Sequence, residues 1–206
     1  MRRTARITST RRTLLALTAA LAGAPFLALA GPVATTPQAL RAVAAAAGLV
    51  LRSPDFAPGG AIALGCVYDG SGCRGGNTSP ALVWKHPPAG TRSFAVLMFD
   101  PDARRGWWHW AVFDIPVGVA SLRAGAGDPA RHLLPLGAIQ ARNDWGSLGY
   151  GGPCPPPGPP HHYRLMIYAL RIARLGLDSS ASAALVAARV QANALAQAQI
   201  VGLYSR

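Results

Sequence analysis

The chain has 206 residues and a formal net charge of +12, with 20 basic residues against 8 acidic ones. Half of the residues are hydrophobic and only 14% are charged, which excludes a disordered chain. The charge by itself invites a nucleic-acid-binding function. However, every acidic residue is Asp, Lys85 is the only lysine, and no basic cluster after residue 12 marks a nucleic-acid face. The charge therefore reflects a general compositional bias, and we expect no nucleic-acid partner.

Residues 1–30 have the layout of a secretory signal peptide. Five arginines within the first twelve residues precede an uncharged apolar stretch, which ends in Ala-Leu-Ala before Gly31. Pro25 within this stretch argues against an uncleaved membrane anchor. Residues 10–15 also have the outline of a twin-arginine signal, so the export route stays open. We expect an exported protein, periplasmic or secreted, that keeps a charge of +7 and no transmembrane span after cleavage.

The remainder divides into an Ala-rich tether, residues 31–48, and one domain, residues 49–206. A domain of this length is large enough to bury a full hydrophobic core. It contains three cysteines, Cys66, Cys73 and Cys154. In an oxidising compartment, an odd count allows one disulfide and one spare thiol.

The apolar runs of the domain are short and are separated by Gly, Pro, Asn and Asp, which favours strands. The clearest runs are residues 94–99, 110–115 and 163–170, and weaker ones are 61–64 and 81–84. No helical period appears between residues 53 and 177, so parallel strands would lack crossover helices. The pattern predicts a mainly β protein with antiparallel sheets.

A helix is expected near the C-terminus. Residues 181–199 contain no Gly or Pro, are rich in helix-forming residues, and follow Asp178, Ser179 and Ser180, which are suited to an N-cap. A weak apolar face comprises Ala181, Leu185, Ala188, Ala192 and Leu195. We expect this helix to pack on the sheet.

Acidic, imidazole and phenol groups gather in two segments, residues 100–110 and 143–163. They contain, in order, Asp-Pro-Asp, Trp-His-Trp, Asn-Asp-x-Gly, Gly-Gly-Pro-Cys and His-x-Tyr. These motifs and their spacing resemble the phosphatidylethanolamine-binding protein family, in particular its bacterial YbhB/YbcL branch, also called Raf kinase inhibitor-like. The resemblance covers about residues 49–206.

The resemblance implies a β-sandwich, in which a large antiparallel sheet packs on a smaller one, with a C-terminal α-helix. It also implies a small cavity for phosphate-like anions or phospholipid head groups. Carried over by position, the ligand-binding residues are Asp100, Asp102, His109, Gly152, Pro153, His161 and Tyr163, with Arg104 and Trp108 at the rim. Close relatives have cysteines at the positions of Cys73 and Cys154, which implies a disulfide between them and a free Cys66.

A phosphate needs several donors that converge from a rigid frame. His109, His161, Tyr163 and the backbone N–H groups of residues 149–152 are the candidate donors. Asp100 would repel an anion, so two other roles stay open for it. It accepts a hydrogen bond from a histidine and fixes the tautomer, or it meets the ammonium of a zwitterionic head group.

The sequence departs from the family pattern after Asp-Pro-Asp-Ala. The family has a proline there, whereas this chain has Arg104 followed by Arg105. The change removes a rigid turn and adds positive charge beside the expected cavity. We therefore expect a stronger preference for plain anions over zwitterions.

Three alternatives accompany the prediction of a non-catalytic binding protein without cofactor or metal. Asp100, Asp102 and the three His residues of these segments are groups that a hydrolase or a metal site would use. However, the chain has no Gly-x-Ser-x-Gly motif, no His-x-x-x-His spacing and no zinc-type cysteine spacing. Relatives in the family inhibit kinases or peptidases, which leaves modulation of an unknown protein partner through the pocket rim as a further alternative.

Overall fold

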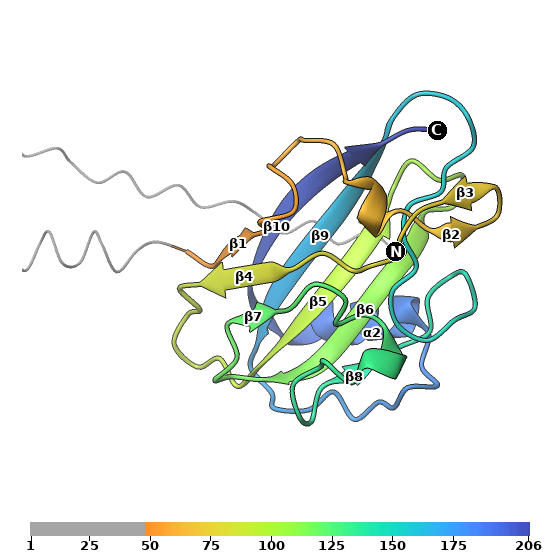
Figure 1. The fold of residues 1–206 in the computed structure, drawn as a ribbon. Coiled ribbons are helices and arrows are strands. Elements are labelled where there is room, and N and C mark those ends of the chain that lie inside the picture. The colour runs from red at the N-terminus through yellow and green to blue at the C-terminus, as the bar shows by residue number, and fades with distance from the viewer. Residues whose placement is uncertain (1–47) are drawn as a thin grey trace, which may run out of the picture.

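The structure is a computed structural model, and it describes residues 48–206 (Figure 1). The predicted signal peptide and all but the last residue of the predicted tether lie outside the described residues. The described part is mainly β, with one α-helix and two short 3-10 helices, Leu64–Cys66 and Pro129–Arg131. Every pair of neighbouring strands is antiparallel, as predicted.

A five-stranded sheet forms the centre of the molecule. Its strand order is β10-β9-β5-β6-β8. The strands are β5 (Ser93–Asp100), β6 (Trp107–Pro116), β8 (Ile139–Gln140), β9 (His161–Leu170) and β10 (Ala194–Tyr204). The central strands are apolar on both faces because both faces of this sheet are covered, which confirms the three clearest strand predictions.

A smaller sheet covers one face of the five-stranded sheet (Figure 1). It consists of β1 (Val50–Arg52), β4 (Leu82–Lys85) and β7 (Ser121–Leu122), in the order β1-β4-β7. Trp84 of β4 packs edge-on against Phe94 of β5, with ring centroids 5.5 Å apart. A separate hairpin pairs β2 (Asp69–Gly70) with β3 (Cys73–Arg74). This two-layer arrangement confirms the expected sandwich.

The weaker strand predictions have different outcomes. The run at 81–84 is confirmed as β4, displaced by one residue. The run at 61–64 is wrong as a strand. Only Ala61 forms a bridge, to Leu203, and Leu64 already begins a 3-10 helix.

The other face of the large sheet carries helix α2 (Ala183–Asn193). Ser182 caps it by accepting a hydrogen bond from the Leu185 N–H at 3.2 Å. The predicted apolar face is wrong, since Leu185 and Leu195 are 45% and 41% exposed. The buried side chains are instead Ala183, Val186, Ala187 and Val190.

The predicted helix of residues 181–199 is also too long. From Ala194 the chain is strand β10, which pairs with β9 along its length. Burial alternates along this segment with a period of two, so Ala196 and Ala198 face the core while Gln197 and Gln199 face solvent. Alanine favours a helix locally, but the unpaired edge of β9 supplies a backbone partner for every second residue, and this tertiary pairing overrides the local preference.

Candidate functional site

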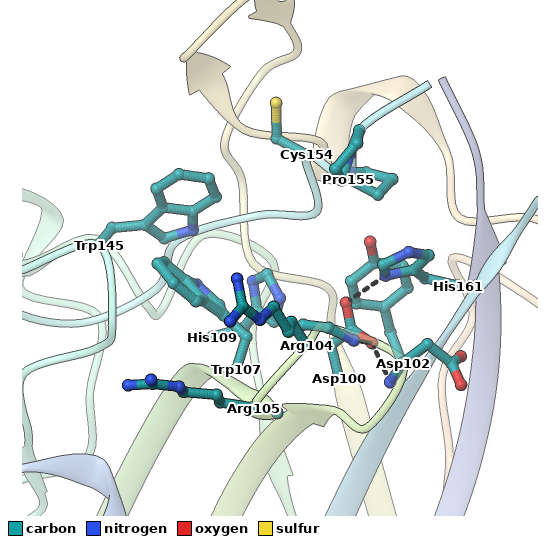
Figure 2. A pocket seen from close by; sticks show the side chains of 14 residues that line it. Asp100, Asp102, Arg104, Arg105, Trp107, His109, Trp145, Cys154, Pro155 and His161 are labelled. Carbon is teal, nitrogen blue, oxygen red and sulfur yellow. Dashed lines mark hydrogen bonds and ion pairs between the residues drawn. The ribbon is translucent and has the colours of Figure 1, made fainter. Parts of the chain in front are cut away.

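A cavity of about 510 Å³ opens where β5 ends and where β6 and β9 begin (Figure 2). The loop between β5 and β6 bounds it on one side, and the chain that leads into β9 bounds it on the other. Fourteen residues line it: Asp100, Asp102, Ala103, Arg104, Arg105, Gly106, Trp107, His109, Trp145, Cys154, Pro155, Pro156, His161 and Tyr163. The predicted residues Gly152, Pro153 and Trp108 are not among them.

A β-bulge places His109 in the cavity. Met98 of β5 pairs with Trp110, and the next residue, Phe99, pairs with Trp108, so His109 is an extra residue in β6. A bulge turns its side chain without ending the strand pairing. Trp107 and His109 consequently both line the cavity, whereas Trp108 packs on Phe99 with ring centroids 4.4 Å apart, on the helix-covered face. The assignment of Trp108 to the rim is therefore corrected to Trp107.

His109 is buried and tied to the backbone. Its Nδ1–H donates to the carbonyl oxygen of Gly151 at 2.6 Å, because a carbonyl can only accept. Burial lowers the pKa of His109 to about 4, so the ring is neutral near pH 7. The remaining ring nitrogen, Nε2, then carries a lone pair. The prediction that His109 offers an N–H to an anion is corrected, since the nitrogen left to the cavity is an acceptor.

Asp100 organises the other side of the cavity. Its Oδ1 accepts from the backbone N–H groups of Asp102 at 2.8 Å and Ala103 at 3.2 Å, which fixes the start of the loop. Its Oδ2 accepts from Nδ1 of His161 at 2.7 Å. Of the two roles left open for Asp100, the structure shows the first, the orientation of a histidine.

Asp102 is engaged in a similar way at the edge of the cavity. Its Oδ2 accepts from the backbone N–H of His162 at 2.7 Å and from Nδ1 of the same residue at 2.8 Å. These bonds lower the pKa of Asp102, the backbone bond most. Both aspartates of the motif therefore use carboxylate oxygens as acceptors in hydrogen bonds within the protein.

Tyr163 has a hydroxyl without a partner in the described protein, as do the indole N–H groups of Trp107 and Trp145, which line the same cavity. Tyr163 is completely buried, lines the cavity, and has no hydrogen-bond partner for its hydroxyl among residues 48–206. Burial raises the pKa of Tyr163, so the phenol keeps its proton. Its ring lies between two imidazoles, with centroids 5.2 Å from His109 and 6.4 Å from His161. A buried polar group without a partner is rare, and in a cavity it points to a ligand.

The glycine turn has a structural role that the sequence did not indicate. All four of its N–H groups are used within the protein. Gly149, Tyr150 and Gly151 donate to backbone carbonyls, and Gly152 donates to Oδ1 of Asn77 at 2.8 Å. A Cβ at Gly152 would collide with the carbonyl oxygen of Cys66, so only glycine allows the two chains to approach this closely. The prediction that the turn donates to an anion is therefore corrected.

Aromatic residues form one wall of the cavity. Trp145 is stacked on Tyr68, with centroids 4.2 Å apart and an angle of 4° between the rings. Its indole also meets Trp107 edge-on at 5.1 Å. Trp145 is the variable residue of the Asn-Asp-x-Gly motif, and nothing in the sequence reveals that the distant Tyr68 stacks on its ring.

The mouth of the cavity is positively charged. Arg104 and Arg105 both line it, and neither side chain has an ion pair or a hydrogen bond within the described residues. Figure 2 shows both side chains extending from the β5–β6 loop, on the side of Trp107. Their charge is therefore available to a bound molecule.

A disulfide closes the opposite wall. Cys154 is bonded to Cys73 of the small hairpin, and Pro155 and Pro156 continue the wall toward β9. Cys66 remains a buried thiol. The pairing agrees with the one that the resemblance implied.

Comparison with known proteins identifies the family. Residues 52–205 match the family model described as phosphatidylethanolamine-binding protein. The chain belongs to the phosphatidylethanolamine-binding protein family. YbcL of Escherichia coli K12 is 45% identical over 78% of this chain and 90% of its own length. YbhB of the same organism is 40% identical over 75% of this chain and 99% of its own length.

A solved structure and a third related protein support the same family. The crystal structure of Escherichia coli YbcL matches with a TM-score of 0.75 at 44% identity, covering 77% of this chain and 98% of YbcL. A Mycobacterium tuberculosis H37Rv protein named putative lipoprotein LppC is 37% identical over 84% of this chain and 80% of its own length. The predicted family and branch are confirmed. Within residues 48–206 no helix is long and apolar enough to cross a membrane.

Proposed function

We propose that this member of the phosphatidylethanolamine-binding protein family is an exported binding protein, whose cavity takes a phosphate-like anion or a phospholipid head group. The observation that carries the proposal is the hydroxyl of Tyr163, which is buried in the cavity, keeps its proton and has no partner in the described protein. A ligand oxygen is the acceptor that would satisfy it. An unpaired buried hydroxyl otherwise costs about 1–3 kcal/mol.

The charge distribution supports an anion as that ligand. Arg104 and Arg105 contribute two unpaired positive charges at the mouth. Asp100 and Asp102 accept hydrogen bonds from His161 and His162, which occupies one oxygen of each carboxylate. The balance favours plain anions over zwitterions such as phosphoethanolamine.

Binding without turnover fits the groups that line the cavity. Among its fourteen lining residues there is no serine, threonine or lysine, and the one cysteine is held in the disulfide. Serine, threonine, lysine and free-thiol nucleophiles are therefore missing from this part of the described chain, while Asp100, Asp102 and His109 are engaged in hydrogen bonds within the protein. We accordingly expect no hydrolysis of a bound phosphate ester.

Two observations support export. A disulfide such as that between Cys73 and Cys154 is typical of an oxidising compartment. The relative LppC is named a putative lipoprotein, which is a class of exported protein.

Isothermal titration of the purified protein with phosphate, phosphoglycerol and phosphoethanolamine tests the function. We expect binding that weakens with added salt and is weakest for phosphoethanolamine. Parallel assays with nitrophenyl acetate and nitrophenyl phosphate should show no turnover. Absence of binding to all three anions would overturn the proposal, and saturable hydrolysis would replace it with an enzymatic function.

A further inference from the structure

Two buried polar groups that line the cavity, those of Tyr163 and His109, have opposite hydrogen-bonding characters, and the indole N–H groups of Trp107 and Trp145 are further donors. Tyr163 offers an O–H, whereas His109 offers the lone pair of Nε2. A ligand that satisfies both must accept one hydrogen bond and donate another. We propose that the cavity selects oxyanions that still carry a proton, namely hydrogen phosphate and protonated phosphate monoesters, over phosphodiesters and sulfate. This inference rests on the proposed anion-binding function and specifies its ligand class.

The acceptor character of His109 is fixed by its surroundings. The carbonyl of Gly151 holds the ring proton on Nδ1 at 2.6 Å, and the side chain is only 2% exposed. The bond to Gly151 is the one hydrogen bond found for the ring among residues 48–206, and the nearby backbone of Gly152 also favours a protonated ring. A neutral ring in this position cannot turn over to present an N–H without breaking a buried hydrogen bond.

The charged groups around His109 do not make its ring cationic near neutral pH. Asp100 of β5 and Asp144 of the loop after β8 are the two nearby carboxylates, and both favour a protonated ring. Both are occupied, Asp100 by His161 and Asp144 by the backbone N–H of Trp108 at 2.8 Å. Burial outweighs them and lowers the pKa of His109 to about 4.

The remaining groups that line this part of the cavity leave the ring neutral as well. Tyr163 of β9 is uncharged at neutral pH, since burial raises its pKa. Arg104 and Arg105 at the mouth are positive and disfavour a second positive charge on the imidazole. The acceptor is therefore present across the neutral range.

An oxyanion without a proton places only lone pairs against Nε2. That contact leaves a desolvated acceptor unpaired and adds repulsion, whereas a P–OH group donates to Nε2 and forms a hydrogen bond. A missing hydrogen bond of this kind lowers affinity by about tenfold or more. The rule has a direct consequence for lipids. The phosphate of a diacyl phospholipid with an alcohol head group is a diester without a proton, so phosphate monoesters that keep a proton are the better ligands.

The decisive experiment compares inorganic phosphate with methyl phosphate by titration calorimetry at about pH 5 and about pH 8. Methyl phosphate loses its last proton near pH 6, whereas inorganic phosphate keeps at least one proton at both pH values. The two ligands carry the same charge at each pH, so their ratio of affinities cancels titration of His161 or any other group. We expect this ratio to shift about tenfold against methyl phosphate on going from pH 5 to pH 8. Sulfate and dimethyl phosphate should bind weakly at both.

Two variants test the assignment to His109. His109→Asn keeps an N–H near the carbonyl of Gly151 but has no atom at Nε2, so the shift in the ratio should disappear. His109→Gln places an amide oxygen near the position of Nε2 and should retain part of the shift. Should either variant fail to fold, the wild-type ratio still decides.

The outcomes separate the inference from the function on which it rests. If no anion binds at either pH, the proposed function falls, and the inference with it. If the anions bind but the affinity ratio is independent of pH, or if sulfate matches phosphate, the inference alone is wrong.

Discussion

Asp100 and His161 join two neighbouring strands at the edge of the cavity, with Nδ1 of His161 2.7 Å from Oδ2 of Asp100. Asp100 is the last residue of β5 and His161 is the first residue of β9. The same carboxylate holds the loop that carries Arg104 and Arg105 through the N–H groups of Asp102 and Ala103. One buried side chain therefore sets both the imidazole and the charged loop.

Asp100→Asn should reverse the tautomer of His161. The amide oxygen can still accept from the loop N–H groups, but its NH₂ then faces Nδ1 and requires an acceptor there. We expect the imidazole proton to move to Nε2 and the free energy of unfolding to fall by about 2 kcal/mol. Long-range ¹H–¹⁵N correlation spectra report the tautomer. Asp102→Asn is the matched control and should alter only the signals of His162. Unchanged His161 signals in Asp100→Asn would contradict the assigned pair.

Tyr163→Phe should separate binding from stability. The hydroxyl has no partner in the described protein, so its removal leaves no other group unpaired. We expect the free energy of unfolding to stay equal or to rise by up to about 1 kcal/mol, while phosphate affinity falls about tenfold. Tyr150→Phe is the matched control, because the Tyr150 hydroxyl donates to the carbonyl of Cys66 at 2.8 Å and Tyr150 does not line the cavity. It should lose about 1 kcal/mol of stability and retain binding. If Tyr163→Phe lost stability but kept its phosphate affinity, Tyr163 would not be a binding residue.

Arg104→Ala, or the family-like Arg104→Pro, should weaken the preference for plain anions. Loss of one exposed charge at the mouth lowers phosphate affinity about two- to fivefold and reduces its dependence on salt. Phosphoethanolamine should change less, because its ammonium gains from the reduced repulsion. Arg189→Ala removes the same charge from the exposed side of α2, on the opposite face of the sheet, and serves as the control. An unchanged ratio of phosphate to phosphoethanolamine affinity would refute the role given to Arg104.

Cys73→Ser combined with Cys154→Ser should destabilise the protein and loosen the cavity. The disulfide spans a sequence separation of 81 residues, and its loss costs about 2–4 kcal/mol. Since Cys154 lines the cavity, anion affinity should fall in the same variant. Urea denaturation and calorimetry measure the two effects.

Peptide mapping of the unreduced protein supplies the control for this variant. It should find the pair Cys73–Cys154 and an unmodified Cys66. Burial, and to a lesser extent Asp55, raise the pKa of Cys66 to about 11, so its thiol should react with iodoacetamide only after unfolding. A bridge between Cys66 and Cys73 would show that the pairing is different.

His109 should make stability depend on pH. Its pKa is about 4 in the folded protein and about 6.5 in the unfolded chain, so the unfolded state binds more protons between these values. The contribution is fully present above about pH 6.5 and is lost as the pH falls toward 4, by up to about 3 kcal/mol. Urea denaturation at several pH values measures this slope. His109→Asn cannot titrate, and its slope in this window should be flatter by that amount. Equal slopes would show that His109 titrates normally in the fold.

The sequence by itself determined the three central strands and the residue types of the cavity. The runs at 94–99, 110–115 and 163–170 form β5, β6 and β9 because a strand covered on both faces needs apolar side chains throughout. The ordered motifs also identified the family and predicted that the Asp, His and Tyr residues now found in the cavity belong to the site. These features depend on local residue type and spacing, which a sequence states directly.

Tertiary structure alone decided how those groups are used. The bulge at His109 depends on the pairing of β6 with β5. Because of it, Trp107 lines the cavity in place of the predicted Trp108. The carbonyl of Gly151 made His109 an acceptor, and Asn77 took the N–H of Gly152. Strand β10 replaced the end of the predicted helix because the edge of β9 was open to it. In each case the deciding partner is distant along the chain, so local propensity carries no information about it.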